Sequence, residues 1–528
     1  MTRVLYVFLG LALAMPAVAQ TPNEARRCAP SDDVLDDLRL ARALSLDLRG
    51  VPPEVEELQA LDDGDVTVDA LVTEWLDSDA FAAQVVRRHR SYLWNTVHNL
   101  MLVSGDWHLR WNDGVWWRPN VSGLLRGAGV HCGDQPARFG PNGEILTRNV
   151  NGAQLEGWVE VPAYWSRDEL VRVCAFDARE TLYAENGEYC GARHERNLDC
   201  GCGPNLQWCV PTGPNRGVGL PDITLVNAAL AKSMDRLIHW NITENRPYSE
   251  LFTTRQMFVN GPMVHYFRHL VAFANLGMDP APVEVELLPD LAWSDVDEWR
   301  LAEAPLQHAG LLTHPAYLLR FMTNRARADR FYTTFLCRPF QPPAGGIPLD
   351  AASISEPDLQ KRAGCKYCHA LLEPAASYWG RWAPAAGNYL WPDAFPTLSD
   401  RCLRCALRQA CDGPCCTPTC RRYYVQQAYT EAEEPYLGML KSYAFRRPEH
   451  AHYVDEGPKL LARRSFADNS LPPCVARRTA EWLLGRDVDE PGDDVWIRDL
   501  TQNFAQSGYL FRTLVQDIVL SERYRRVR

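Results

Sequence analysis

The stretch GCKYCHALLEP, residues 364–374, decides how this chain is interpreted. Cys365, Cys368 and His369 form C-x-x-C-H, the attachment signature of a c-type haem, in which two thiols bond the porphyrin and the histidine binds iron. A shuffled chain of the same composition would contain about 0.013 such motifs, so chance is a weak explanation. The motif therefore predicts one covalently attached haem c.

Three other interpretations of the motif stay open at this stage. Cys365 and Cys368 could form a disulfide beside an incidental histidine, or the motif could have lost its haem. The two thiols could also join Cys402 and Cys405 in a four-sulfur zinc site, although the 33 intervening residues exceed the usual spacing. An oxidising compartment favours a disulfide over zinc thiolates.

The N-terminus indicates which compartment the chain occupies. Arg3 precedes an apolar run from Val4 to Ala14, and the A-x-A segment 17–19 completes the pattern of a cleaved signal peptide. We therefore expect a periplasmic or secreted protein. No later segment is apolar for long enough to span a bilayer.

Charge limits the partners. The chain carries a net charge of -11, and its basic residues are scattered, so nucleic acid and anionic membranes are poor candidates. We expect a redox partner protein in the periplasm or outside the cell.

Alternating helical and irregular patterns predict a mainly α fold, in which a multi-helix, cytochrome-like core carries two irregular cysteine-rich insertions. A helix is expected from Ser31 to Gly50, and another from the prolines at 52–53 to Val97. Short strands are expected at 158–165 and 169–176, whereas 224–240, 247–259 and most of the chain after 434 have helical period. The expected divisions are a signal peptide (1–19), an N-terminal helical domain (20–104), a first insertion (105–223), a central helical domain with the motif (224–384), a second insertion (385–433) and a C-terminal helical domain (434–528).

Each insertion holds six cysteines, which suits three disulfides of undetermined connectivity. In the first insertion they are Cys132, Cys174, Cys190, Cys200, Cys202 and Cys209, and in the second Cys402, Cys405, Cys411, Cys415, Cys416 and Cys420. The tryptophans of WHLRWNDGVWW, residues 107–117, could stack on a sugar, but core packing is the commoner role of tryptophan.

An electron carrier keeps both axial positions of its haem iron filled. Met439 is our first choice for the sixth ligand, because it follows the second insertion and thioether ligation suits a c-type carrier. The other candidates are His308, His314, Met322, His450 and His452.

Several blocks of the chain resemble the planctomycete-type cytochrome-like secreted proteins, which are large exported proteins built from domains of unknown function. The similar blocks lie at 41–58, 244–260, 308–321, 330–343, 365–382, 465–486 and 503–524. Together they cover about a quarter of the chain, in the family's order. Where the family usually has a glycine after its acidic-proline pair, this chain has Ala375 and Ala376.

The resemblance implies that Cys365 and Cys368 carry thioether bonds and that His369 is the proximal ligand. It also implies that Cys337 pairs with Cys474. No hydrolase elbow, P-loop, dinucleotide fingerprint or H-E-x-x-H occurs in the sequence, and whether the chain is an enzyme stays open. The preferred function is electron transfer, or the redox module of an oxidoreductase. The alternative is a haem-free, disulfide-stabilised secreted protein that binds a partner or a polysaccharide.

Overall fold

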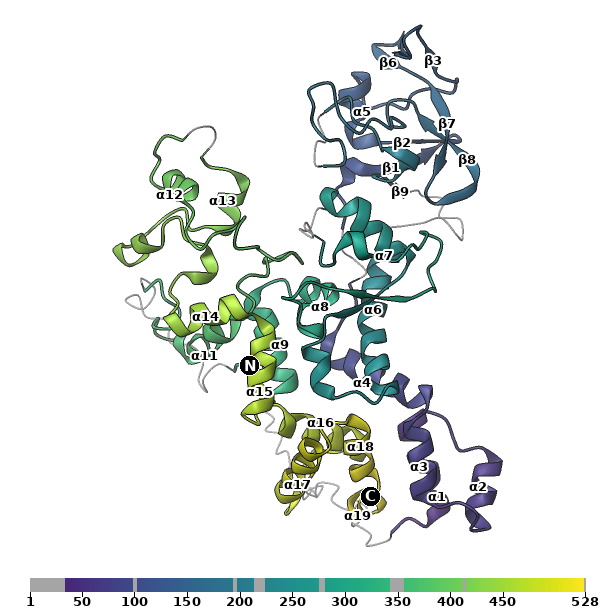
Figure 1. Ribbon diagram of the computed structural model, residues 1–528, viewed down its shortest axis with the longest axis vertical. Coiled ribbons are helices and arrows are strands. Elements are labelled where there is room, and N and C mark those ends of the chain that lie inside the picture. The colour runs from purple at the N-terminus through teal and green to yellow at the C-terminus, as the bar shows by residue number, and fades with distance from the viewer. Residues whose placement is uncertain are drawn as a thin grey trace, which may run out of the picture.

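The computed structural model describes residues 34–97, 102–192, 197–212, 224–274, 281–341, 356–411 and 415–526. The expected signal peptide at 1–19 and Cys28 lie outside these ranges. About 48% of the chain is helical, and a curled sheet accompanies the helices. Figure 1 shows the sheet at the top, helices α12 and α13 on the left, and the other helices between and below them.

The N-terminal part folds as four helices: α1 (Asp37–Arg49), α2 (Val55–Asp62), α3 (Val68–Leu76) and α4 (Asp79–Leu93). The first helix is capped by Asp36, whose carboxylate accepts a hydrogen bond from the Arg39 N–H, so it begins later than the expected Ser31. Gly50 ends it at φ 77°, as expected. The single helix expected up to Val97 is wrong: Thr67 and Ser78 each cap a new helix with a side-chain oxygen.

The first insertion is built on a five-stranded sheet of order β7-β8-β2-β1-β9. Its strands are β1 (His108–Asn112), β2 (Val115–Trp117), β7 (Trp158–Ala163), β8 (Ser166–Cys174) and β9 (Val210–Thr212), and helix α5 (Pro119–Arg126) follows β2. Strands β7 and β8 pair antiparallel, which confirms the two strands expected from alternating residues. Short two-stranded pieces surround the sheet.

The central part begins with α6 (Thr224–Thr243), as its helical period predicted. The helix expected at 247–259 is wrong, because this segment forms the 3-10 helix Tyr248–Phe252 and strand β10 (Gln256–Val259). β10 pairs antiparallel with β11 (Arg300–Glu303), about forty residues further along the chain. The segment 256–259 is a strand because β11 pairs with it, and no local sequence pattern reveals that partner.

The helices around the motif are α8 (Pro315–Arg320), α9 (Asn324–Phe335), α11 (Lys366–Ser377), α14 (Pro448–Glu456) and α15 (Pro458–Ala467). The second insertion contains α12 (Asp400–Ala406) and α13 (Pro418–Tyr423). The C-terminal helices are α16 (Pro472–Leu484), α17 (Asp493–Gln506), α18 (Phe511–Val519) and α19 (Glu522–Arg525).

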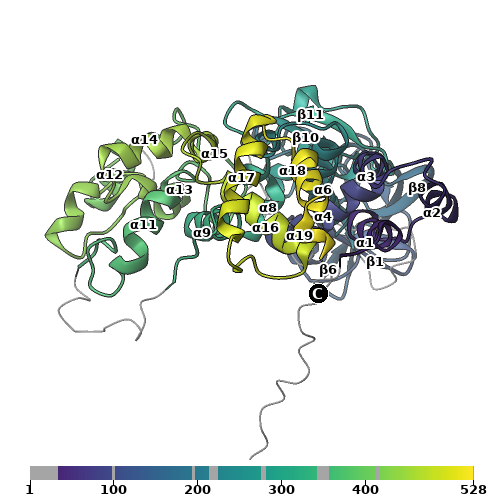
Figure 2. The same cartoon turned by 90° about the horizontal axis from the view of Figure 1, so that it is seen from below.

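A large and a small apolar core stabilise these parts, besides a three-residue cluster around the Cys132–Cys174 disulfide. The larger core joins residues from α1 to α19 and includes the inner face of the sheet, so the N-terminal and C-terminal helices pack together. The backbone N–H of Leu35 donates to the carbonyl of Arg525 at 2.9 Å. The second insertion has a small core of its own around Leu390, Tyr424 and Leu440. Figures 1 and 2 show α12 and α13 projecting to one side of the helical body.

In the described part of the chain, every helix is too short or too polar to cross a membrane.

Buried histidines make the stability of the core depend on pH. Burial lowers the pKa of His89 to about 4, and those of His308 and His314 to about 3. Below pH 6.5 these histidines therefore bind protons in the unfolded chain but not in the folded chain. Stability is complete above about pH 6.5 and falls as the pH drops towards 4, by up to about 1.4 kcal/mol per pH unit for each histidine.

We expect the free energy of unfolding, measured in urea at several pH values, to fall between pH 6.5 and 4.5. His89→Gln should reduce this slope by up to about 1.4 kcal/mol per pH unit, which is the contribution of one proton. His239→Gln makes the same change on a half-exposed side chain of α6 and is the matched control. Equal slopes in wild type and His89→Gln would contradict the assignment.

Candidate haem-attachment site

The C-x-x-C-H motif forms the start of helix α11. Cys365 is the N-cap residue, and Cys368 and His369 lie in the first helical turn, so the three side chains share one face at positions i, i+3 and i+4. Helix α11 packs against both α9 and α14. It continues through Pro374 to Ser377, and Ala375 and Ala376 are buried.

Cys365 and Cys368 are the two free cysteines in the described part of the chain, and both are half-buried. The other fourteen described cysteines form seven disulfides. The pairs are Cys132–Cys174, Cys190–Cys200, Cys202–Cys209, Cys337–Cys474, Cys402–Cys420, Cys405–Cys416 and Cys411–Cys415. Each insertion thus holds three disulfides, as expected, and Cys337 pairs with Cys474.

The disulfides bear on two of the three alternatives left open by the sequence, and the alternative that the motif has lost its haem stays open. The four-sulfur zinc site is wrong, because Cys402 and Cys405 are bonded to Cys420 and Cys416. A disulfide between Cys365 and Cys368 is not formed. In a chain whose other described cysteines are oxidised, a free C-x-x-C pair is the arrangement that haem attachment requires.

Thiol labelling tests this distribution directly. In denatured, unreduced protein that carries no haem, we expect the label on Cys365 and Cys368 and on none of the fourteen disulfide cysteines. Peptide mapping would locate the label. A result in which most cysteines of the two insertions react would contradict the disulfide framework.

The ring of His369 is oriented by a carboxylate one turn further along the same helix. Its Nδ1 lies 2.7 Å from Oε1 of Glu373. Since an ionised carboxylate only accepts hydrogen bonds, Nδ1 carries the proton and Nε2 holds the free lone pair. Metal-binding histidines usually donate their second ring N–H to such an acceptor. The neutral ring of His369 is therefore held with its free lone pair on Nε2.

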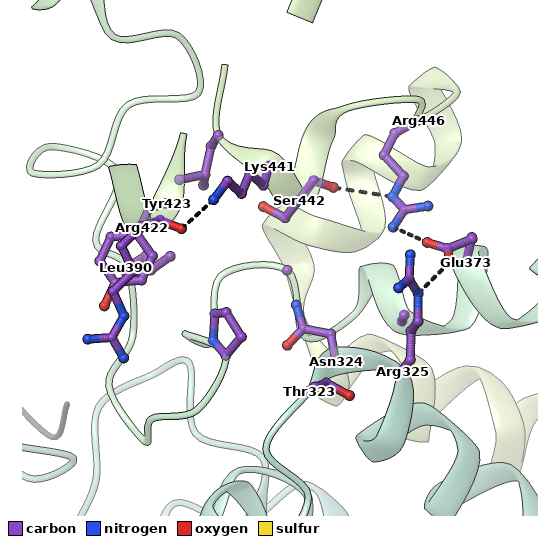
Figure 3. Close-up of a pocket in the computed structure, with 14 residues that line it drawn as sticks. Thr323, Asn324, Arg325, Glu373, Leu390, Arg422, Tyr423, Lys441, Ser442 and Arg446 are labelled. Carbon is purple, nitrogen blue, oxygen red and sulfur yellow. Dashed lines mark hydrogen bonds and ion pairs between the residues drawn. The ribbon is translucent and has the colours of Figure 1, made fainter. Parts of the chain in front are cut away.

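Two arginines hold Glu373 in place. Arg325 Nε, from the first turn of α9, donates to Oε1 at 2.6 Å, and Arg446 Nη2 donates to Oε2 at 2.9 Å. Burial alone would raise the pKa of Glu373, but the hydrogen bond from Arg325, the charges of both arginines and the hydrogen bond from His369 lower it below its usual value. The side chain is 7% exposed. Glu373 is thus a fixed negative charge beside the imidazole (Figure 3).

Met439 follows the second insertion in the chain and packs against it. Its side chain packs against the small core around Leu390, Tyr424 and Leu440, and its backbone pairs with Leu398. Ordinary packing accounts for this methionine, and its role as the sixth ligand stays a prediction.

Among the other candidates for the sixth ligand, His314 is excluded by its hydrogen bonds. It is fully buried, its Nδ1 accepts from the N–H of Ala316, and its Nε2 lies 3.0 Å from Ser233 Oγ. His450 is a buried residue of α14, the helix that packs against α11, and its Nδ1 has no hydrogen-bond partner in the described structure.

The tryptophans of 107–117 are mostly packing residues. Trp107 is fully buried, Trp116 is 4% exposed, and Trp111 at 39% stands with its edge towards Trp116. A broad, exposed sugar-stacking platform is therefore absent from this described stretch.

One further group of possible metal ligands exists in the first insertion. His131 lies close to the sulfurs of Cys132 and Cys174. These two sulfurs are bonded to each other, so neither is a thiolate that could bind a metal.

Comparisons with known proteins add no assignment: no protein-family model, no curated protein and no solved structure matches this chain.

Proposed function

We propose that this chain is an exported, monohaem c-type cytochrome-like protein that acts in electron transfer or as the redox module of an oxidoreductase. The observation that carries the proposal is the combination, at the start of α11, of two free thiols with a histidine whose Nδ1 is held by Glu373. The resemblance to the planctomycete-type cytochrome-like secreted proteins supports it, and so does the oxidising compartment that seven disulfides indicate.

The residues fit a covalently bound haem. Cys365 and Cys368 would form the two thioether bonds, and His369 Nε2 would bind the iron. Leu371, on the same helix, exposes 66% of its surface, and Tyr367 exposes 54%, so apolar surface is available beside the thiols. When bound, the haem would supply a one-electron couple. The chain contributes the fixed imidazole and the buried carboxylate, which favours the more positive, oxidised iron.

Expression of the full chain in a periplasm that contains haem-attachment machinery tests this proposal. We expect a c-type absorption spectrum that persists after denaturation and organic extraction, and its loss in Cys365→Ser/Cys368→Ser. Cys411→Ser/Cys415→Ser removes two cysteines from the second insertion and should keep the spectrum. A folded, exported protein without covalent haem would remove the proposal and favour the haem-free interaction or polysaccharide-binding protein.

Replacement of Glu373 by glutamine should raise the reduction potential of the attached haem. The change removes the negative charge beside the imidazole and leaves the charges of Arg325 and Arg446 in place. A tenfold loss in the preference of the site for oxidised over reduced iron corresponds to about 59 mV for one electron, and we expect a shift of about that size. A potentiometric titration measures the shift. Glu434→Gln, an exposed charge change just after the second insertion, is the control and should leave the potential nearly unchanged.

A further inference from the structure

Glu373, the partner of His369, also lines a small cavity. The cavity has a volume of about 190 Å³ and is enclosed by the start of α9, the middle of α11 and the segments around Leu390, Tyr423 and Leu440 (Figure 3). Sites for drug-sized ligands are usually about 300–1,000 Å³. The cavity therefore suits a small ligand rather than a porphyrin.

The charges of the lining are mainly positive. Arg325, Arg422, Lys441 and Arg446 line the cavity, and Glu373 is the one carboxylate among the lining residues. Three positive charges are thus in excess, in a chain whose net charge is -11. Because the chain is acidic overall, a concentration of cations around a cavity points to an anionic ligand.

Several donor side chains around the cavity are held in position by hydrogen bonds or burial, and each still has an N–H or O–H group that could donate to a ligand. Lys441 Nζ donates to the carbonyls of Arg421 and Arg422 at 3.0 and 2.8 Å, which uses two of its three N–H groups. The hydroxyl of Ser442 is buried and has no partner in the described structure. Arg446 Nη2 donates to Glu373, and its Nε donates to the Ser442 carbonyl. The other terminal nitrogen of Arg446, Nη1, therefore remains available.

The start of helix α9 adds to the positive potential. Thr323 is its N-cap, and Asn324 and Arg325, its first two residues, line the cavity together with Thr323. The first N–H groups of a helix have no partner within the helix, and this end carries a partial positive charge. α9 is 12 residues long. Its first turn therefore supports the same ligand class as the side chains do.

We propose that this cavity binds a small carboxylate or phosphate oxyanion. Guanidinium groups recognise both kinds of anion through paired N–H donors, and Lys441 supplies a point charge. The proposal goes beyond the haem assignment and does not depend on it. The oxyanion has two possible sources, a small anion from solution or a propionate group of an attached haem.

Calorimetric titration of the full, exported chain prepared without haem tests the proposal, with malonate and inorganic phosphate as probes. We expect saturable binding of one molecule of at least one probe per chain. Arg422→Gln and Lys441→Gln should each weaken binding at least tenfold. Arg404→Gln removes an exposed cation of the same insertion that does not line the cavity, and it should bind as wild type does.

Arg422 is exposed and holds no ion pair in the described structure, so its replacement tests the cavity even if Lys441→Gln fails to fold. Absence of binding by both probes overturns the proposal, as does an equal loss in Arg404→Gln. A repeat with haem-loaded protein identifies the source: retained malonate or phosphate binding indicates an anion from solution, and blocked binding indicates a haem propionate.

Discussion

Replacing Asp177 by asparagine is expected to destabilise the first insertion by about 3–5 kcal/mol. Asp177 is fully buried and accepts hydrogen bonds from Arg118 Nε at 2.9 Å and from Arg126 Nη2 at 3.0 Å. Arg126 also forms a two-point ion pair with Glu156. Burial alone would raise the pKa of Asp177, but the charges of the two arginines lower it, so the group is ionised in the folded state.

The loss of one carboxylate leaves two buried guanidinium groups facing a single negative charge. A buried charge without a partner is costly because desolvation is no longer offset. Urea unfolding followed by tryptophan fluorescence measures the effect, since seven of the 17 tryptophans lie between residues 105 and 212. Glu160→Gln breaks an ion pair with Arg172 in which both side chains are about half exposed, and it should cost less than about 1 kcal/mol. Similar losses in the two variants would contradict the importance of the buried network.

Removing the disulfide between Cys337 and Cys474 should have an effect of similar size. The bond links the end of α9 to α16 across 137 residues, and this loop contains the C-x-x-C-H helix and the second insertion. In the chain-entropy model, a cross-link of this length contributes about 5 kcal/mol by restricting the unfolded chain. We therefore expect Cys337→Ala/Cys474→Ala to lower the urea midpoint strongly.

The matched control is Cys411→Ala/Cys415→Ala. This pair closes a loop of only four residues, for which the same model gives about 2 kcal/mol. The two double variants remove the same kind of bond, so their difference isolates the effect of loop length. Equal losses would show that local packing, rather than loop closure, sets the contribution of the long-range disulfide.

Local signals in the sequence predicted much of the helical structure but not its interruptions. Gly50 ends α1 as expected, and the long helical period of 224–240 forms α6. The helix expected up to Val97 is divided because Thr67 and Ser78 cap new helices within a continuous apolar period. The segment 256–259 is a strand because β11 supplies its hydrogen-bond partners, and that partner lies beyond the reach of any local pattern.

The candidate site was predicted in part. The spacing of Cys365, Cys368 and His369 identifies the motif, but the sequence does not show that these thiols are free. Glu373 was missed as a partner of His369, although the i, i+4 spacing on a helix signals such a contact. The arginine contacts were not predictable from spacing, since Arg325 and Arg446 lie 48 and 73 residues from Glu373. Only the packing of α11 against α9 and α14 brings them together.

The most direct test of the haem assignment is the mass of the peptide that contains residues 365–369, released by proteolysis from protein exported by a host with active haem-attachment machinery. We predict a peptide that carries haem on both Cys365 and Cys368 and absorbs visible light. A peptide from the same protein with two free thiols, or with a Cys365–Cys368 disulfide, while the host's own c-type cytochromes are loaded, would contradict the account.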